Sequence, residues 1–211
     1  MHKLTLTVLG LACIPYCGQA QTNDPAGPDT GVIGSVAGMP REYTAQTSSE
    51  RIRSYIMGTF GPVAVGSAIL SGSISQAQGT PKEWGGGAEA FGERIGNSYA
   101  RHVIRKTLEF GGATLLHEDN RYLPSMESGF GRRAFYAVRS TFIAHDYAGH
   151  EHPAYSRFAG ALGGSFIATI WAPRSTSSSG DALVSFGISV ATAAGFNVVK
   201  EFSRDLKRRK K

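Results

Sequence analysis

The chain has 211 residues, 41% of them hydrophobic, and a formal net charge of +6 from 22 Lys and Arg against 16 Asp and Glu. This length suits a single domain with a sizeable core. Only two cysteines are present, Cys13 and Cys17, which excludes a disulfide-dense scaffold.

The first twenty residues have the pattern of a secretory signal peptide. Lys3 precedes an apolar run from Leu4 to Ile14, and small residues stand at Gly18 and Ala20, next to a suitable cleavage point. We therefore expect an exported protein of the periplasm or cell envelope. Both cysteines would be removed with the peptide, so the mature chain would be held together by packing alone.

Three regions are expected: a signal peptide at 1–20, a flexible arm at 21–47 and a helical domain at 48–211. The arm is rich in Pro, Gly, Thr and Asp and has few large apolar residues, so it cannot bury enough surface to order itself. The domain opens with Thr47–Glu50, which matches a capping box, and Pro62 is expected to end that helix or begin the next.

A second helix start is indicated at Thr80–Glu83, where Thr, Pro and Glu occupy capping positions, and this helix is expected to reach about Leu116. Turn residues and apolar spacing then predict a loop over 118–132, a helix over 133–147 and a break at Gly149. A helix from His152 to Trp171 is expected next, followed by a polar linker over 173–180 and a last helix capped by Asp181.

Small residues recur every fourth position in several of these helices. Such a stripe lets a second helix backbone approach closely, as in glycine zippers, and it also allows self-association. The residues expected to pack helices are Ala88, Gly92, Gly96, Gly160, Gly164, Gly187, Ala191 and Gly195.

Together these patterns predict an all-α protein, a compact bundle of five or six glycine- and alanine-rich helices. An alternative is a small outer-membrane β-barrel, because apolar and small residues alternate from Phe186 to Val198. The capped, charged helix after Thr80 consumes too much chain for eight strands, so the bundle is favoured.

Charge is unevenly distributed along the chain. The stretch 182–199 has no charged residue and is close to the length of a membrane span, although its many polar and small residues favour a buried helix. The C-terminus is strongly basic and is suited to an anionic membrane surface or an envelope partner; nucleic acid is not expected outside the cytoplasm. Its cations are Arg204, Lys207, Arg208, Arg209, Lys210 and Lys211.

Three segments carry a resemblance: 84–94 (WGGGAEAFGER), 116–122 (LHEDNRY) and 200–207 (KEFSRDLK). They resemble a group of uncharacterised exported bacterial proteins that repeat W-G-x-G-A-E-x-[FY]-G-x-R, H-E-D-x-R-Y and K-E-F-x-x-D-x-K segments. The resemblance spans most of the chain from residue 84 onward. It implies export and a shared fold, and implies no chemistry.

The densest set of possible metal ligands lies around Gly149. Imidazole and carboxylate suit zinc and other divalent metals, so His145, His150, His152 and His117 are candidate ligands of a metal-dependent hydrolase. However, His145 and His150 are five residues apart and do not share a helix face as the pair in H-E-x-x-H does. A polar loop without a cofactor is the favoured interpretation.

Other enzyme classes are disfavoured, because the chain contains neither a G-x-S-x-G segment nor a phosphate-binding G-x-x-x-x-G-K-[ST] loop. The sequence therefore predicts an exported, non-enzymatic cell-envelope protein, associated with a membrane through glycine-rich helices and a basic C-terminus.

Overall fold

The computed structural model describes residues 43–208, and within that range the protein is predominantly helical, as predicted. The signal peptide, nearly all of the arm and Arg209–Lys211 lie outside the described residues. The helices are α1 (Ser48–Phe60), α2 (Pro62–Ala77), α3 (Ala88–Leu115), α4 (Phe130–Arg139), α5 (Tyr155–Ala168) and α6 (Ser179–Arg208), with short 3₁₀ helices at η1 (Lys82–Trp84) and η2 (Arg174–Thr176).

The predicted capping box of α1 and the predicted helix start at Pro62 are confirmed, whereas the predicted start at Thr80–Glu83 is wrong, because only a short 3₁₀ helix forms there and α3 begins at Ala88. The side chain of Thr47 accepts a hydrogen bond from the backbone N–H of Glu50, whose carboxylate accepts the N–H of Thr47 in return. Pro62 occupies the first turn of α2, where its missing N–H has no cost. At α6 the cap is Ser178 rather than Asp181: the Ser178 hydroxyl accepts the N–H of Asp181, and the Asp181 carboxylate accepts the N–H of Ser178.

The predicted helix over 133–147 is wrong, because α4 ends at Arg139 and the chain then enters a small sheet. Strand β2 (Ile143–Asp146) lies between β1 (Glu118–Asp119) and β3 (Glu151–Pro153), and both pairings are antiparallel. So short a strand has little preference of its own and depends on neighbours distant in sequence. The next helix, α5, is also shorter than predicted.

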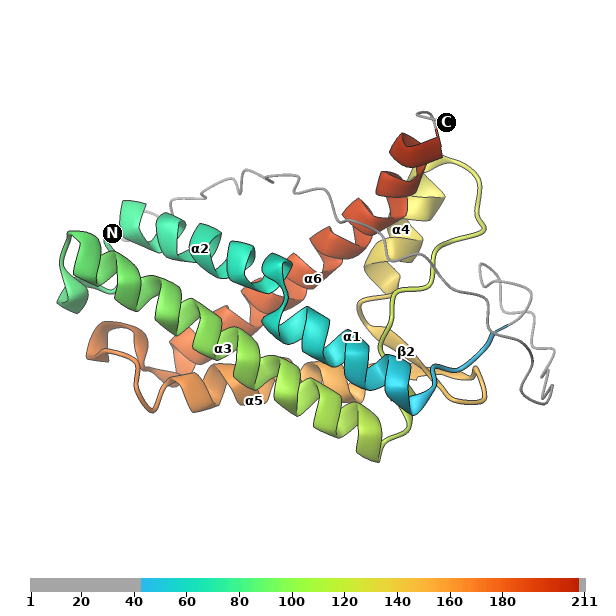
Figure 1. The fold of residues 1–211 in the computed structure, drawn as a ribbon, viewed down its shortest axis with the longest axis horizontal. Coiled ribbons are helices and arrows are strands. Elements are labelled where there is room, and N and C mark those ends of the chain that lie inside the picture. Colours follow the sequence, from blue (N-terminus) through green and yellow to red (C-terminus); the bar gives the residue numbers. More distant parts are fainter. Residues whose placement is uncertain (1–42, 209–211) are drawn as a thin grey trace.

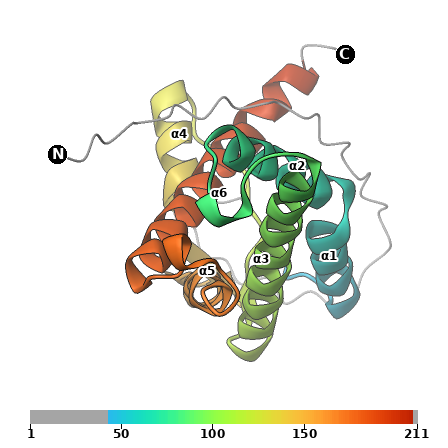
Figure 2. The same cartoon turned by 90° about the vertical axis from the view of Figure 1, so that its left-hand side faces the viewer.

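The helices pack in series rather than around one axis. The main contacts run from α2 to α3, from α3 to α5, from α5 to α6, and from α6 to α4, while α1 rests on α3. In Figure 1, α2 and α3 lie side by side along the long axis of the molecule. Figure 2, a view along that direction, shows α1 and α6 on opposite sides of α3. The helical course of residues 179–208 overturns the β-barrel alternative for the described chain.

Close helix packing relies on only some of the small residues. A Cβ added to Gly72 would lie 3.0 Å from the backbone nitrogen of Ile95, which brings α2 against α3. A Cβ at Gly160 would lie 2.9 Å from the carbonyl oxygen of Arg105, and one at Gly164 would lie 3.1 Å from the Arg105 side chain. The α3–α5 contact therefore requires the glycines of α5, as predicted.

The other predicted packing glycines face open space. A Cβ at Gly92, Gly96, Gly187 or Gly195 would meet no atom within 4 Å in the described chain, and Ala88 and Ala191 are exposed. Their predicted role in packing helices within the chain is therefore wrong. The four-residue spacing places them on one helix face, but it does not specify which face meets a neighbour.

Candidate functional site

A row of three side chains crosses one face of the small sheet. The strand register places His145 opposite both Asp119 and Glu151, and directly paired residues of antiparallel strands share a face. His145 is 8% exposed, and its Nε2 atom lies 3.8 Å from Oε1 of Glu151. Burial lowers the pKa of His145, against the opposing influence of Glu151 and Asp119. The imidazole is therefore held in its neutral form between two carboxylates.

Both carboxylates of this row accept hydrogen bonds or form ion pairs with side chains from outside the sheet. The hydroxyl of Tyr43 donates to Asp119 at 2.9 Å, and Nε of Arg121 lies 2.9 Å from the same carboxylate. Arg139 donates two hydrogen bonds to Glu151, at 2.6 and 3.1 Å. Burial, together with Asp119, raises the pKa of Tyr43 above its ordinary value. These contacts make the row an ionic junction between the last residues of the predicted arm and α4.

Glu118 lies on the opposite face of the sheet and caps α5. Its side chain is 1% exposed, and Oε2 accepts the backbone N–H of Ser156 at 3.0 Å and also the Ser156 hydroxyl. Ser156 is in the first turn of α5, where the helix dipole favours a negative charge. Asn120 donates to the Ser156 hydroxyl at 2.7 Å. Glu118 thus fixes the end of α3 to the start of α5.

The predicted metal ligands are not brought together. His145 and His152 lie on opposite faces of the sheet, because Ala144 rather than His145 is the partner of His152. His150 is exposed and lies 3.0 Å from Asp146, and His117 packs edge-on against Tyr147. Within residues 43–208, no three His, Cys, Asp or Glu side chains form a group that could hold a metal ion. The described residues therefore do not form the predicted site.

Arg94 clamps the loop that precedes α3. Its side chain is 1% exposed and donates to the carbonyls of Thr80 at 2.8 Å, Pro81 at 3.0 Å and Gly85 at 3.0 Å. It also donates to Oε1 of Gln76 at 2.6 Å. Because a buried guanidinium needs many acceptors, this arginine fixes the loop to the ends of α2 and α3. Within the segment 84–94, Arg94 therefore has a structural role.

Glu201 holds the segment between β1 and α4 in a similar way. It is 1% exposed and accepts hydrogen bonds from the Tyr122 hydroxyl at 2.8 Å, the Ser125 N–H at 3.1 Å and Nε of Arg133 at 2.7 Å. Burial and the bond to Glu201 raise the pKa of Tyr122 above its ordinary value. Sequence reasoning missed the buried roles of Arg94, Glu118 and Glu201; the signal available was a charged residue within each of the three segments that carry the resemblance.

Large apolar side chains gather on the outer surfaces of α1, α2 and α6. Their exposed fractions are high for a folded chain, for example 51% at Phe60, 44% at Ile69 and 58% at Ile188. Two segments of the described chain, Ser48–Ala77 and Ser179–Ser203, are long and apolar enough to cross a membrane. Only 6% of the apolar window in the second segment is buried. An exposed apolar surface of this extent is typical of a membrane or protein interaction site.

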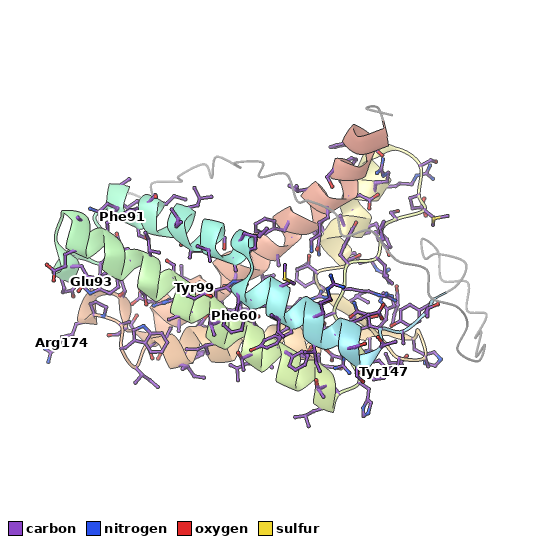
Figure 3. All side chains as sticks on the ribbon, in the orientation of Figure 1. Phe60, Phe91, Glu93, Tyr99, Tyr147 and Arg174 are labelled. Carbon is purple, nitrogen blue, oxygen red and sulfur yellow. The ribbon has the colours of Figure 1, made fainter. Side chains whose placement is uncertain are left out.

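The polar sheet lies at one end of the molecule and is reached by α1, whose Arg51 guanidinium lies 5.0 Å from the ring centroid of Tyr147. Figure 3 places Tyr147, beside the sheet, at the opposite end of the long axis from Glu93 and Arg174. The basic C-terminus follows α6; Arg204, Lys207 and Arg208 belong to that helix, while Arg209, Lys210 and Lys211 lie outside the described residues. Comparison with known protein families, characterised proteins and solved structures finds no match to this chain.

Proposed function

We propose that this protein is an exported, non-enzymatic component of the cell envelope that attaches to a membrane through the outer apolar surfaces of α1, α2 and α6. The observation that carries the proposal is the exposure of α6. Its segment Ser179–Ser203 has the composition of a membrane-buried helix, yet only 6% of its apolar window is fully buried, and large side chains such as Ile188 are exposed. Water would solvate this surface poorly, whereas lipid or a partner would cover it.

The spacing of exposed residues on α1 fits a surface position. Arg53, Ile56, Met57 and Phe60 lie on one face of the helix, because they follow at three- and four-residue intervals, and all four are exposed. A long cationic side chain next to apolar residues can reach the headgroups while its neighbours enter the acyl region.

The charged side chains of α3 fit attachment of the protein by one surface better than insertion of the whole bundle across the membrane. α3 packs directly against α2 but carries charged side chains along its length: Glu89, Glu93, Arg94, Arg101, Arg105, Lys106 and Glu109. Charges in the middle of a bilayer are costly, so α3 is better placed on the aqueous side of the apolar helices.

Fractionation of cells into soluble periplasm, inner membrane and outer membrane tests the proposal. We expect the mature chain in a membrane fraction and expect it to remain there in high salt, since apolar contacts are not screened. The variant Ile188→Asp should shift protein into the soluble fraction. Leu115→Asp is the matched control, because Leu115 is 80% exposed but stands at the end of α3. Recovery of the wild-type chain entirely in the soluble periplasm would overturn the proposal.

A further inference from the structure

Lys200 lies on the inner face of α6, the face that packs toward α5. Phe186 and Asn197 precede it by fourteen and three residues, so at 3.6 residues per turn the three lie within about 60° of one another around the helix. The ring centroid of Phe186 lies 6.3 Å from that of Phe158 on α5, and the amide of Asn197 donates to the hydroxyl of Thr141 at 3.1 Å. Lys200 therefore points toward the other helices of the fold rather than toward the outer apolar surface.

α3 brings two further cations and one carboxylate against α5. A Cβ added to Gly160 would lie 3.0 Å from the Cβ of Glu109, and one added to Gly164 would lie 3.1 Å from the Cβ of Arg105. The ammonium of Lys106 lies 2.8 Å from a carboxylate oxygen of Glu109, whose side chain is 13% exposed. The glycines of α5 therefore bring a charged stretch of α3 to the contact between the two helices.

The charges of three helices meet there in one cluster, which we call the cation cluster: Arg105, Lys106 and Glu109 of α3, Arg157 of α5 and Lys200 of α6. Burial opposes the ionisation of Glu109, yet three nearby cations lower its pKa: Lys106, Arg157 and Arg105. Burial lowers the pKa of Lys200, and the charges of Lys106 and Arg157 lower it further, against Glu109. Positive charges of three different helices are thus close enough to repel one another.

The cation cluster holds more positive than negative charge. Its four cations share one carboxylate, which already forms an ion pair within the cluster. Arg157 donates to three backbone carbonyls, which neutralise none of its charge, although Glu118 and Asp119 offset part of it. In the part of the chain that the structure describes, the side chains of Arg105 and Lys200 have neither a hydrogen bond nor an ion pair. An added anion would therefore lower the repulsion in the cluster.

A dissolved ligand has access to this cluster from water. Lys200 is exposed, and the side chain of Lys106 is 32% exposed. Ile188, on the outer apolar surface of α6, precedes Lys200 by twelve residues and so lies about 120° away from it around the helix. A bilayer that covered Ile188 would leave Lys200 on the side of the helix that faces α5. The source of an anion for this cluster is therefore the aqueous phase.

From these relationships we infer that the cation cluster binds a small dissolved oxyanion of the phosphate class, with the ammonium of Lys200 as its principal contact. Ammonium groups form charge-assisted hydrogen bonds with phosphate oxygens, and such bonds are about twice as strong as neutral ones. Helices that are held together by close glycine contacts keep the cations in place before the anion arrives, which lowers the entropic cost of binding. The inference goes beyond the proposed membrane attachment and does not depend on it.

Calorimetric titration of the purified protein with sodium phosphate tests this inference. Sodium chloride of equal ionic strength is the reference, because phosphate also stabilises proteins without a specific site. We expect saturable binding by the wild type and a dissociation constant raised about tenfold or more by Lys200→Gln, which loses a charge-assisted hydrogen bond. Lys200→Arg should retain binding. Lys82→Gln is the matched control, because Lys82 is exposed on η1 and its replacement changes the net charge equally.

A melting curve in chloride checks that the variant folds. Lys200→Gln should melt at or above the wild-type temperature, since it removes one of several like charges. Unsaturable binding by the wild type, or equal phosphate affinity of the wild type and Lys200→Gln, would overturn the inference and leave membrane attachment untouched. If vesicles of phosphatidylglycerol displace phosphate from the wild type, the anion comes from a lipid headgroup, and the choice of a dissolved ligand is overturned.

Discussion

The guanidinium group of Arg133 on α4 lies 2.7 Å from Oε1 of Glu201 on α6, and Arg133 also lies 2.7 Å from Asp205 one turn later. The same guanidinium group lies over the ring of Phe202, with its central carbon 4.8 Å from the ring centroid. Phe202 stands between Glu201 and Asp205 in the sequence. One arginine thus joins α4 to α6 through both charge and an aromatic face. The position of α4 relative to α6 depends on this junction.

Replacement of Glu201 tests that dependence. Glu201→Ala should lower the free energy of unfolding by about 3 kcal/mol, because it removes the acceptor of the Tyr122 hydroxyl and one of the two carboxylates that pair with Arg133. Glu127→Ala is the control: its carboxylate is 3.7 Å from Arg132 on the surface, and its loss should cost less than about 1 kcal/mol. Urea denaturation measures both, and equal effects would contradict the junction.

Glycine substitutions should distinguish the glycines that contact a neighbouring helix from the glycines that face open space. Gly160→Ala is expected to destabilise the protein by about 1–3 kcal/mol, because the new methyl group meets the backbone of α3 and the helices must move apart. Gly92→Ala faces open space within a helix and should stabilise it by about 0.5–1 kcal/mol. Thermal unfolding in the same buffer measures both. A lower melting temperature for Gly92→Ala would indicate that this stripe contacts something in solution.

Arg94→Lys should loosen the loop before α3. A lysine ammonium cannot reach four acceptors arranged for a guanidinium, so buried carbonyls would lose their donors at a cost of about 2–4 kcal/mol. Hydrogen exchange followed by mass spectrometry should show faster exchange at residues 80–87. Lys82→Ala, an exposed change in the same loop, should leave exchange there unaltered. Unchanged protection in Arg94→Lys would dismiss the clamp.

Acidification should weaken the fold through His145. Its pKa is lowered by burial, so the unfolded chain binds the proton more readily than the folded chain does. This destabilisation is absent at high pH and grows as pH falls below the pKa of an unfolded histidine, about 6.5. Denaturation midpoints at several pH values should therefore fall less steeply for His145→Asn than for the wild type. Burial also lowers the pKa of His102, so His102→Asn should reduce the slope in the same way. Parallel curves for His145→Asn and the wild type would contradict the assignment.

The helical fold could be predicted because its signals are local. Thr47 and Glu50 form their capping box within one turn, and Pro62 starts a helix whatever surrounds it. The sheet could not be predicted in this way, since β2 depends on β1, more than twenty residues earlier. The wrong prediction that Gly92 and Gly96 pack against another helix has a similar cause. Their spacing shows that one face of the helix carries small residues, but tertiary contacts decide whether another helix lies against that face.

The candidate surfaces were predictable to an unequal degree. The uncharged stretch in α6 and the basic C-terminus are visible in the sequence. The start of α4 was misplaced, because the predicted helix began at Arg133 whereas α4 begins at Phe130. The histidines around Gly149 suggested a shared site, but strand alternation sends His145 and His152 to opposite sides of the sheet. Proximity along the chain did not establish proximity of side chains there.

The serial packing of the helices has a mechanical consequence. Because α1 and α2 rest on α3, while α4 rests on α6, either outer pair can detach without breaking the glycine-mediated contact between α3 and α5. Local opening of this kind costs less free energy than complete unfolding. We therefore expect α4 and α1 to exchange their amide hydrogens before α3 and α5 do, so the protein should open from its outer helices inward.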